Sequence, residues 1–168
     1  MDSFPAIEID KVKAWDFRLA NINTSECLNV AYGVDANYLD GVGVSITSIV
    51  LNNRHINLDF YIIADVYNDG FFQKIAKLAE QNQLRITLYR INTDKLQCLP
   101  CTQVWSRAMY FRLFAFQLLG LTLDRLLYLD ADVVCKGDIS QLLHLDLNGA
   151  VAAVVKDVDP MQEKAASR

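Results

Sequence analysis

Short apolar runs rich in β-branched and aromatic residues recur along this chain, and segments with helical periodicity separate them. Four of these runs are candidate strands, at residues 28–34, 58–64, 85–91 and 125–129. Strands that alternate with helices at this spacing favour βαβ units, in which parallel strands form a sheet covered by helices on both faces. The sequence therefore predicts an α/β, Rossmann-like fold with a mostly parallel sheet.

Three helices are predicted between these strands. Residues 44–51 carry apolar side chains at helical spacing and end at two asparagines. Asn68 or Asp69 can cap a second helix, in which the apolar positions up to Ala79 share one face. A third helix is expected from Trp105 to Leu119, ahead of Gly120. These helices supply the two outer layers of the predicted fold.

The two ends of the chain differ from this central pattern. The first 26 residues are mixed and polar, so we expect an amino-terminal appendage (residues 1–26) and one globular domain (residues 27–168). Residues 150–155 are apolar enough to form a fifth strand. Neither a further strand nor a stop signal follows Pro160. We therefore expect a truncated domain that lacks its carboxyl-terminal part.

Composition excludes several classes of function. The net charge is -4 and Lys or Arg residues form no long run, so a nucleic-acid partner is not expected. The amino terminus has no signal-peptide pattern, and the longest apolar run, near residues 113–123, is too short to span a bilayer. Scattered cysteines fit the cytoplasm. The close pair Cys98 and Cys101 can be reduced loop thiols, a redox pair or half of a zinc site.

Two acids, Asp130 and Asp132, directly follow the apolar run 126–129. Ligands of open parallel sheets bind beyond the carboxyl ends of the strands. In an extended chain, residues i and i+2 lie on one side, about 6.6 Å apart, so both carboxylates can reach one Mg²⁺ or Mn²⁺ ion. Acids at the end of a strand buried on both faces are costly unless a cation or donors neutralise them. That context favours a metal site over ordinary loop acids.

Several motifs occur in an order that resembles one family. They are Leu28-Asn-Val-Ala-Tyr-Gly-Val-Asp-Ala-Asn-Tyr38, Tyr128-Leu-Asp-Ala-Asp-Val133 and Gly137-Asp-Ile139. From about Leu28 onward the chain resembles the retaining glycosyltransferases of family 8, and specifically the bacterial lipopolysaccharide core hexosyltransferases. The resemblance implies a nucleotide-sugar-binding domain of the GT-A type. It also implies metal-dependent transfer of glucose or galactose, from UDP-glucose or UDP-galactose, to the lipopolysaccharide core.

The resemblance implies roles for individual residues. In the family, the acids of the Asp-x-Asp motif bind Mn²⁺ or Mg²⁺ and the UDP diphosphate, which assigns Asp130 and Asp132 with Ala131 between them. Arg112 lies on the apolar third helix, where its guanidinium must leave the core or find an anion, and the family motif directs this Arg to the donor. Asp157 is similar to the family acid that contacts the donor hexose near the reaction centre.

The nucleoside end of the donor is expected beyond the first strand. Asp35 and Asn37 match the family positions that contact uracil and ribose, and Gly33 and Val34 would give backbone contacts to the base. The alternative is that Asp35 and Asn37 are ordinary turn and helix-cap residues.

Other functions stay open at this point. A Mg²⁺-dependent nucleotidyl or phosphosugar transferase also pairs carboxylates with a metal, but it normally opens with a Gly-rich phosphate loop, which Gly41 and Gly43 do not form. A catalytically inactive UDP-sugar-binding fragment is a further alternative, because the late family motifs, including the His that completes the metal shell, have no counterpart. Contact with the cytoplasmic face of the inner membrane is expected to come from the missing part.

Overall fold

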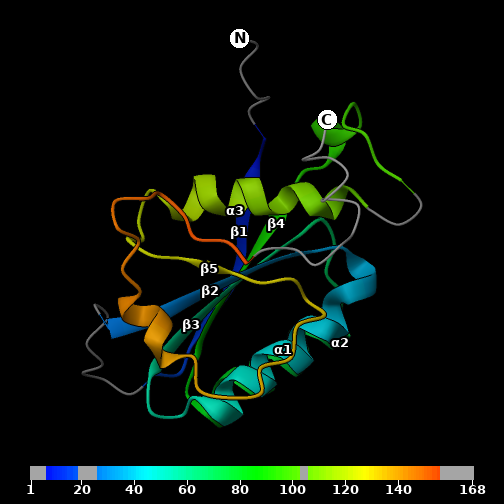
Figure 1. The fold of residues 1–168 in the computed structure, drawn as a ribbon. Coiled ribbons are helices and arrows are strands. Elements are labelled where there is room, and N and C mark those ends of the chain that lie inside the picture. Colours follow the sequence, from blue (N-terminus) through cyan, green and yellow to red (C-terminus); the bar gives the residue numbers. More distant parts are fainter. Residues whose placement is uncertain (1–6, 19–25, 103–105, 156–168) are drawn as a thin grey trace.

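The computed structural model describes residues 7–18, 26–102 and 106–155. Its centre is a five-stranded sheet with the strand order β1-β4-β3-β2-β5 (Figure 1). Four of its strands run parallel to one another: β2 (Cys27–Val34), β3 (Asn57–Ala64), β4 (Arg85–Ile91) and β5 (Leu127–Tyr128). The mostly parallel sheet is thus confirmed, although β5 is much shorter than predicted.

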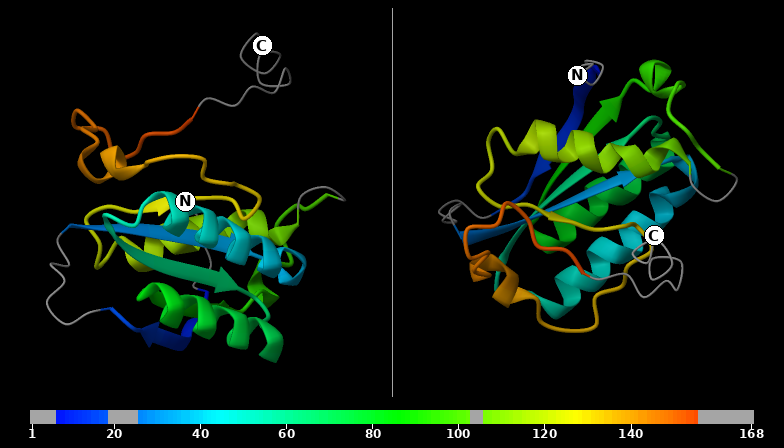
Figure 2. Two further views of the ribbon diagram at one scale, coloured as in Figure 1. Left: turned by 90° about the horizontal axis from the view of Figure 1, so that it is seen from below. Right: turned by 45° about the horizontal axis from the view of Figure 1, so that its top comes forward.

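Helices cover both faces of the sheet, as predicted (Figure 2). Helices α1 (Leu39–Asn52) and α2 (Asp69–Asn82) pack on one face, and α3 (Phe111–Leu119) packs on the other. Side chains of each strand alternate between two apolar cores, so that Phe60 faces α1 and α2 while Tyr61 faces α3. The connections in the described part of the chain include the 3-10 helices η2 (Ala36–Tyr38), η3 (Asp94–Leu96), η4 (Arg107–Tyr110) and η5 (Ser140–His144).

Strand β1 (Ile9–Asp16) was not predicted. It runs antiparallel along β4 and forms the outer edge of the described sheet. The chain then continues to Arg18, whose guanidinium lies 3.3 Å from the Asp59 carboxylate, a buried group on β3 that also contacts Arg85. Residues 9–16 therefore belong to the sheet. The boundary between an appendage and a domain at residue 27 stays a prediction.

The strand predicted at residues 150–155 is wrong for the described structure. These residues pair with no strand, and the side chains of Val151 and Val154 are 101% and 90% exposed. A strand needs a neighbouring strand for its backbone hydrogen bonds. The paired residues of β5 form theirs with β2, and residues 150–155 have no such partner.

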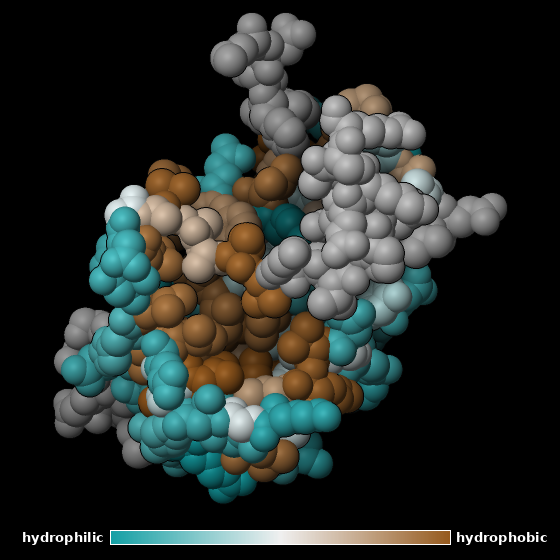
Figure 3. Space-filling view, in the orientation of Figure 1, coloured by the Kyte–Doolittle hydropathy of each residue, from teal (hydrophilic) through white to brown (hydrophobic). Residues whose placement is uncertain are grey.

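Apolar side chains gather on the surface between α3 and α1, on the side of β5 (Figure 3). Within the described ranges, no helix is long and apolar enough to cross a membrane.

Candidate functional site

The predicted site residues meet at the carboxyl edge of two neighbouring strands. Asp35 follows β2 and Asp130 comes two residues after β5. These strands are paired in register, with Ala31 opposite Tyr128, and the backbone N–H of Leu129 donates to the Ala31 carbonyl at 3.0 Å. The sheet therefore brings together two segments that are about a hundred residues apart in the sequence.

The segment Asp130–Asp132 forms a turn. The backbone N–H of Val133 donates to the Asp130 carbonyl at 3.2 Å, so the prediction that these residues continue in an extended conformation is wrong. The reason is the packing of Ala131, which is 8% exposed and belongs to the core beneath α1. A Cβ atom at Gly41 of α1 would lie 3.0 Å from the Ala131 carbonyl oxygen. The turn buries the middle residue of the motif against this glycine.

The two acids of the motif are exposed to solvent. The Asp130 side chain is 57% exposed, Asp132 is also exposed, and Leu127 and Tyr128 of β5 are half-buried. The prediction that these acids end a strand buried on both faces is therefore wrong. Burial gives no reason for a cation here. Because the carboxylates already face solvent, a ligand can reach them directly.

Arg112 leaves the apolar face of α3 and finds an anion, as predicted. Its Nη2 lies 2.9 Å from Asp130 Oδ1, and its guanidinium carbon lies 5.3 Å from the centre of the Tyr128 ring. The Tyr128 hydroxyl donates to the Gly33 carbonyl at 3.5 Å, and burial raises the pKa of Tyr128 to about 12. The ring thus stays neutral and supports the guanidinium through its face.

Gly33 has a packing role that the sequence did not reveal. A Cβ atom on Gly33 would lie 2.6 Å from the Phe111 Cβ and 2.7 Å from the Tyr128 hydroxyl oxygen, so that a side chain here would force its neighbours to shift. Absence of a side chain therefore lets α3 and Tyr128 approach β2. Val34 is 3% exposed, and its side chain belongs to the core on the other face of the sheet. Only its backbone is available for the predicted base contact.

Asp35 begins helix η2 as its N-cap. Its Oδ1 accepts a hydrogen bond from the backbone N–H of Asn37 at 3.0 Å, which agrees with the turn-and-cap interpretation of both residues. Its Oδ2 accepts from the Ser106 hydroxyl at 2.7 Å. Neither Ser106 nor Tyr128 was predicted as a site residue. The signal for Ser106 is its place as a capping residue ahead of a helical segment.

Asp65 also follows a strand at this edge of the sheet. One of its carboxylate oxygens is buried and has no hydrogen-bond partner among the described residues. Burial raises the pKa of Asp65, and the nearby Asp35 carboxylate raises it further. Asp65 lines a cavity of about 330 Å³ together with Glu8, Asp10 and Arg90. The cavity lies beside the carboxyl ends of β3 and β4.

Two oxygen donors for a cation are present. Asp130 and Asp132 offer carboxylate oxygens, which suit Mg²⁺ or Mn²⁺. Among the described residues, no group of three or more His, Cys, Asp or Glu residues is arranged to hold a metal ion. The rest of a coordination shell would therefore come from ligand oxygens or from residues outside the described ranges. Asp157, the predicted catalytic acid, lies outside the described residues.

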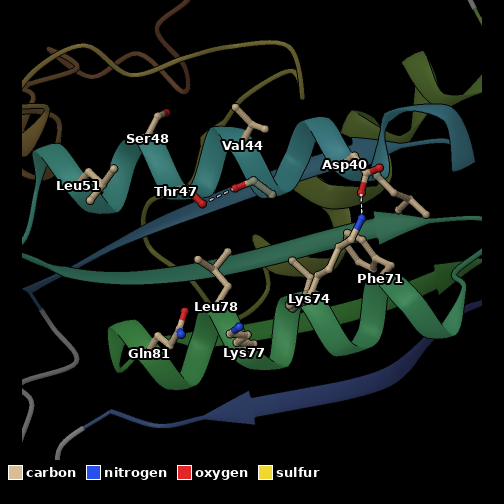
Figure 4. A pocket seen from close by; sticks show the side chains of 13 residues that line it. Asp40, Val44, Thr47, Ser48, Leu51, Phe71, Lys74, Lys77, Leu78 and Gln81 are labelled. Atoms are coloured by element: carbon tan, nitrogen blue, oxygen red, sulfur yellow. Dashed lines mark hydrogen bonds and ion pairs between the residues drawn. The ribbon is translucent and has the colours of Figure 1, made fainter.

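A larger groove lies away from these residues. It has a volume of about 680 Å³ and runs between α1 and α2, where Lys74 reaches across to Asp40 at 2.8 Å (Figure 4). Its lining is mostly apolar and includes Val44, Leu51 and Leu78. These helices cover the face of the sheet opposite α3. The groove is therefore separate from the Asp35 and Arg112 side chains.

A parallel sheet with acids and a guanidinium beyond its carboxyl edge is the arrangement of a nucleotide-binding α/β domain. The sequence model of glycosyl transferase family 8 matches residues 29–168. The chain belongs to this family, as the motifs predicted.

Individual relatives are consistent with this assignment. The chain is 98% identical over 168 residues to the lipopolysaccharide 1,2-glucosyltransferase of Escherichia coli (strain K12), covering 100% of this chain and 50% of that protein. It is 38% identical over 143 residues to the lipopolysaccharide 1,3-galactosyltransferase of Salmonella typhimurium (strain LT2), covering 84% of this chain and 42% of that protein. The chain spans about half the length of these curated relatives.

The fold recurs in solved structures. A crystal structure of the galactosyltransferase LgtC, in complex with donor and acceptor sugar analogues, matches with a TM-score of 0.62 and 20% sequence identity. The match covers 71% of this chain and 43% of that chain. It confirms the predicted α/β, GT-A type fold class.

Proposed function

We propose that this chain is the nucleotide-sugar-binding part of a metal-dependent, retaining glycosyltransferase. The reaction would transfer a hexosyl group from a UDP-sugar to the lipopolysaccharide core oligosaccharide. The observation that carries the proposal is the placement of Arg112 and Asp130 in contact, beside Asp35, at the carboxyl edge of two paired strands. Family membership supplies the reaction class.

Each end of the donor would meet different side chains. Uracil and ribose would lie against Asp35 and Asn37, with backbone contacts from Gly33 and Val34. Arg112 would donate hydrogen bonds to the diphosphate, which a guanidinium can do with two parallel N–H groups.

Asp130 and Asp132, with Ala131 holding the turn between them, would hold a Mg²⁺ or Mn²⁺ ion. Such an ion acts as a Lewis acid that neutralises the charge developing on UDP as it leaves. Asp157 is proposed to contact the donor hexose.

The names of the relatives support a choice between the two candidate sugars. Both a glucosyltransferase and a galactosyltransferase match, and the relative at 98% identity is named as a 1,2-glucosyltransferase. UDP-glucose is therefore the favoured donor over UDP-galactose. The acceptor would be lipid-anchored, so we propose that the protein works in the cytoplasm, at the cytoplasmic face of the inner membrane.

Two alternatives differ from this proposal in testable ways. An inactive UDP-sugar-binding fragment would bind the donor without transfer. A nucleotidyl or phosphosugar transferase is disfavoured, because Gly41 and Gly43 lie inside helix α1 and form no phosphate loop.

The test is a calorimetric titration of the 168-residue chain with UDP, UDP-glucose and UDP-galactose, with and without Mn²⁺. UDP binding that Mn²⁺ strengthens, and that Asp35→Ala weakens without loss of fold, supports the proposed site. Unchanged UDP affinity in Asp35→Ala would remove Asp35 from it. Transfer of glucose to purified core acceptor, measured with the complete protein of the relative's length, separates the enzyme from the binding fragment.

A further inference from the structure

We propose that Ser106 is a positioning residue of the nucleotide site, which holds the Asp35 carboxylate in the orientation that binds the base. The inference rests on the proposed function, because it assumes that UDP binds beside Asp35. Its basis is the 2.7 Å hydrogen bond between the Ser106 hydroxyl and Asp35 Oδ2, which joins two residues 71 positions apart in the sequence.

The direction of this hydrogen bond follows from a second contact. The Ser106 hydroxyl oxygen lies 3.3 Å from the backbone nitrogen of Ala108 and caps helix η4. A backbone N–H can only donate, so the hydroxyl accepts there and its own hydrogen is free to point at Asp35. A carboxylate accepts hydrogen bonds, and donation to a charged group is stronger than donation to a neutral one. One hydroxyl therefore links the start of η4 to the carboxylate.

Asp35 has one anchor on each oxygen. Oδ1 accepts from Asn37 in the adjacent turn, and Oδ2 accepts from Ser106 in a distant segment. Without Ser106, the carboxylate keeps its cap hydrogen bond with Asn37 but can rotate about this remaining contact. A carboxylate offers about four acceptor positions, so two remain for a ligand. Ser106 therefore sets the direction in which these two remaining acceptor positions point.

Orientation matters because of the chemistry of the base. The N3–H group of uracil donates a hydrogen bond, whereas N3 of cytosine is an acceptor. A carboxylate held in a fixed direction favours the first base and repels the second. Ser106 is thus expected to contribute to selectivity for UDP over CDP, as well as to affinity.

Ser106 also begins the segment that carries the diphosphate side of the site. Helix η4 leads directly into α3, where Arg112 pairs with Asp130. If the role of Ser106 were only to start this helix, its loss would weaken binding of inorganic pyrophosphate with Mn²⁺ as much as binding of UDP. If Ser106 instead orients Asp35, its loss should weaken binding of the uridine-containing ligand alone.

Three substitutions separate capping from positioning. Ser106→Ala removes both the cap and the donor. Ser106→Asp keeps a good N-cap, but it cannot donate and places a second carboxylate beside Asp35. Ser106→Thr keeps the hydroxyl.

We expect the Ala and Asp variants to raise the Kd for UDP about 3- to 10-fold, and to lower the preference for UDP over CDP. The Thr variant should rescue both, and Ser106→Ala should add nothing in an Asp35→Ala background.

The matched control is Asn68→Ala. Asn68 caps α2 by accepting from the backbone N–H of Phe71 at 2.8 Å, so its loss lowers the melting temperature as a lost cap does while UDP affinity stays unchanged. If Ser106→Asp binds UDP as wild type does while Asp35→Ala weakens binding, the positioning role is overturned and the nucleotide site stands. If Asp35→Ala also binds as wild type does, the nucleotide site itself is wrong.

Discussion

Arg112→Met is expected to strengthen Mn²⁺ binding in the absence of UDP and to weaken the binding of UDP itself. In the structure the Arg112 guanidinium forms an ion pair with the Asp130 carboxylate, with 2.9 Å between Arg112 Nη2 and Asp130 Oδ1. A cation that binds Asp130 must displace or repel this group. UDP would draw the guanidinium toward its diphosphate and so leave the carboxylate to the metal. Arg112 thereby couples the two ligands, each of which should strengthen binding of the other.

The size of the effect follows from exposure. The Arg112 and Asp130 side chains are 45% and 57% exposed, so the dielectric of water applies. Two unit charges about 4 Å apart then interact by ~1 kcal/mol, which corresponds to about a fivefold change in a Kd. Without UDP, Arg112→Met should bind Mn²⁺ about fivefold more tightly than wild type. With UDP, the lost charge-assisted hydrogen bonds should weaken UDP binding by about tenfold or more.

The measurement is Mn²⁺ titration followed by electron paramagnetic resonance of the free ion, with and without saturating UDP. Lys74→Met is the matched control, because Lys74 forms a similarly exposed ion pair with Asp40 in the groove between α1 and α2. That variant should leave Mn²⁺ affinity unchanged. Weaker or unaltered Mn²⁺ binding by Arg112→Met without UDP would refute the competition between guanidinium and metal.

Two further predictions concern stability and thiol chemistry. Gly33→Ala should destabilise the fold by about 1–3 kcal/mol, because the new methyl group overlaps with α3. Gly43 lies in α1, and a Cβ atom there meets no neighbouring atom within 4 Å, so Gly43→Ala should stabilise the fold by about 0.5–1 kcal/mol. Equal midpoints of urea unfolding for the two variants would contradict this prediction. Burial raises the pKa of Cys27 from 9.0 to about 12, so its thiol stays protonated at pH 8. Iodoacetamide at pH 8 should therefore label the exposed Cys98 and Cys101 but spare Cys27, and mass spectrometry of the labelled native protein checks this.

The sheet was predictable where strands are buried on both faces. Strands β3 and β2 are buried along almost their whole length, and their sequences are mostly apolar, interrupted by Asp59 in β3 and Asn29 in β2. Strand β1 gave no such signal, because only every third of its side chains is partly buried and the rest face solvent. Its place in the sheet depends on pairing with β4 and on the contact of Arg18 with Asp59, neither of which a local pattern reveals.

The candidate site was predictable as a set of residues but not as a geometry. Motif resemblance singled out Arg112 and Asp130, and the apolar surroundings of Arg112 indicated that its guanidinium must leave the core or find an anion. The hydrogen bond from Ser106 to Asp35 could not be inferred, because it joins segments that only the fold brings together. The turn at Ala131 was missed for the same reason, since an Asp-x-Asp after an apolar run reads equally well as extended chain.

Two glycines explain why the acids and the guanidinium meet where they do. Gly33 leaves room for Phe111 and Tyr128, so that α3 approaches β2 closely enough for Arg112 to stand over the Tyr128 ring. Gly41 lies in α1, where glycine costs helix stability, and there it leaves room for the carbonyl of Ala131. That cost is offset by a close backbone approach, since the turn it permits holds Asp130 toward Arg112. The position of the proposed diphosphate site therefore depends on the space that Gly33 and Gly41 leave open, because neither residue has a side chain.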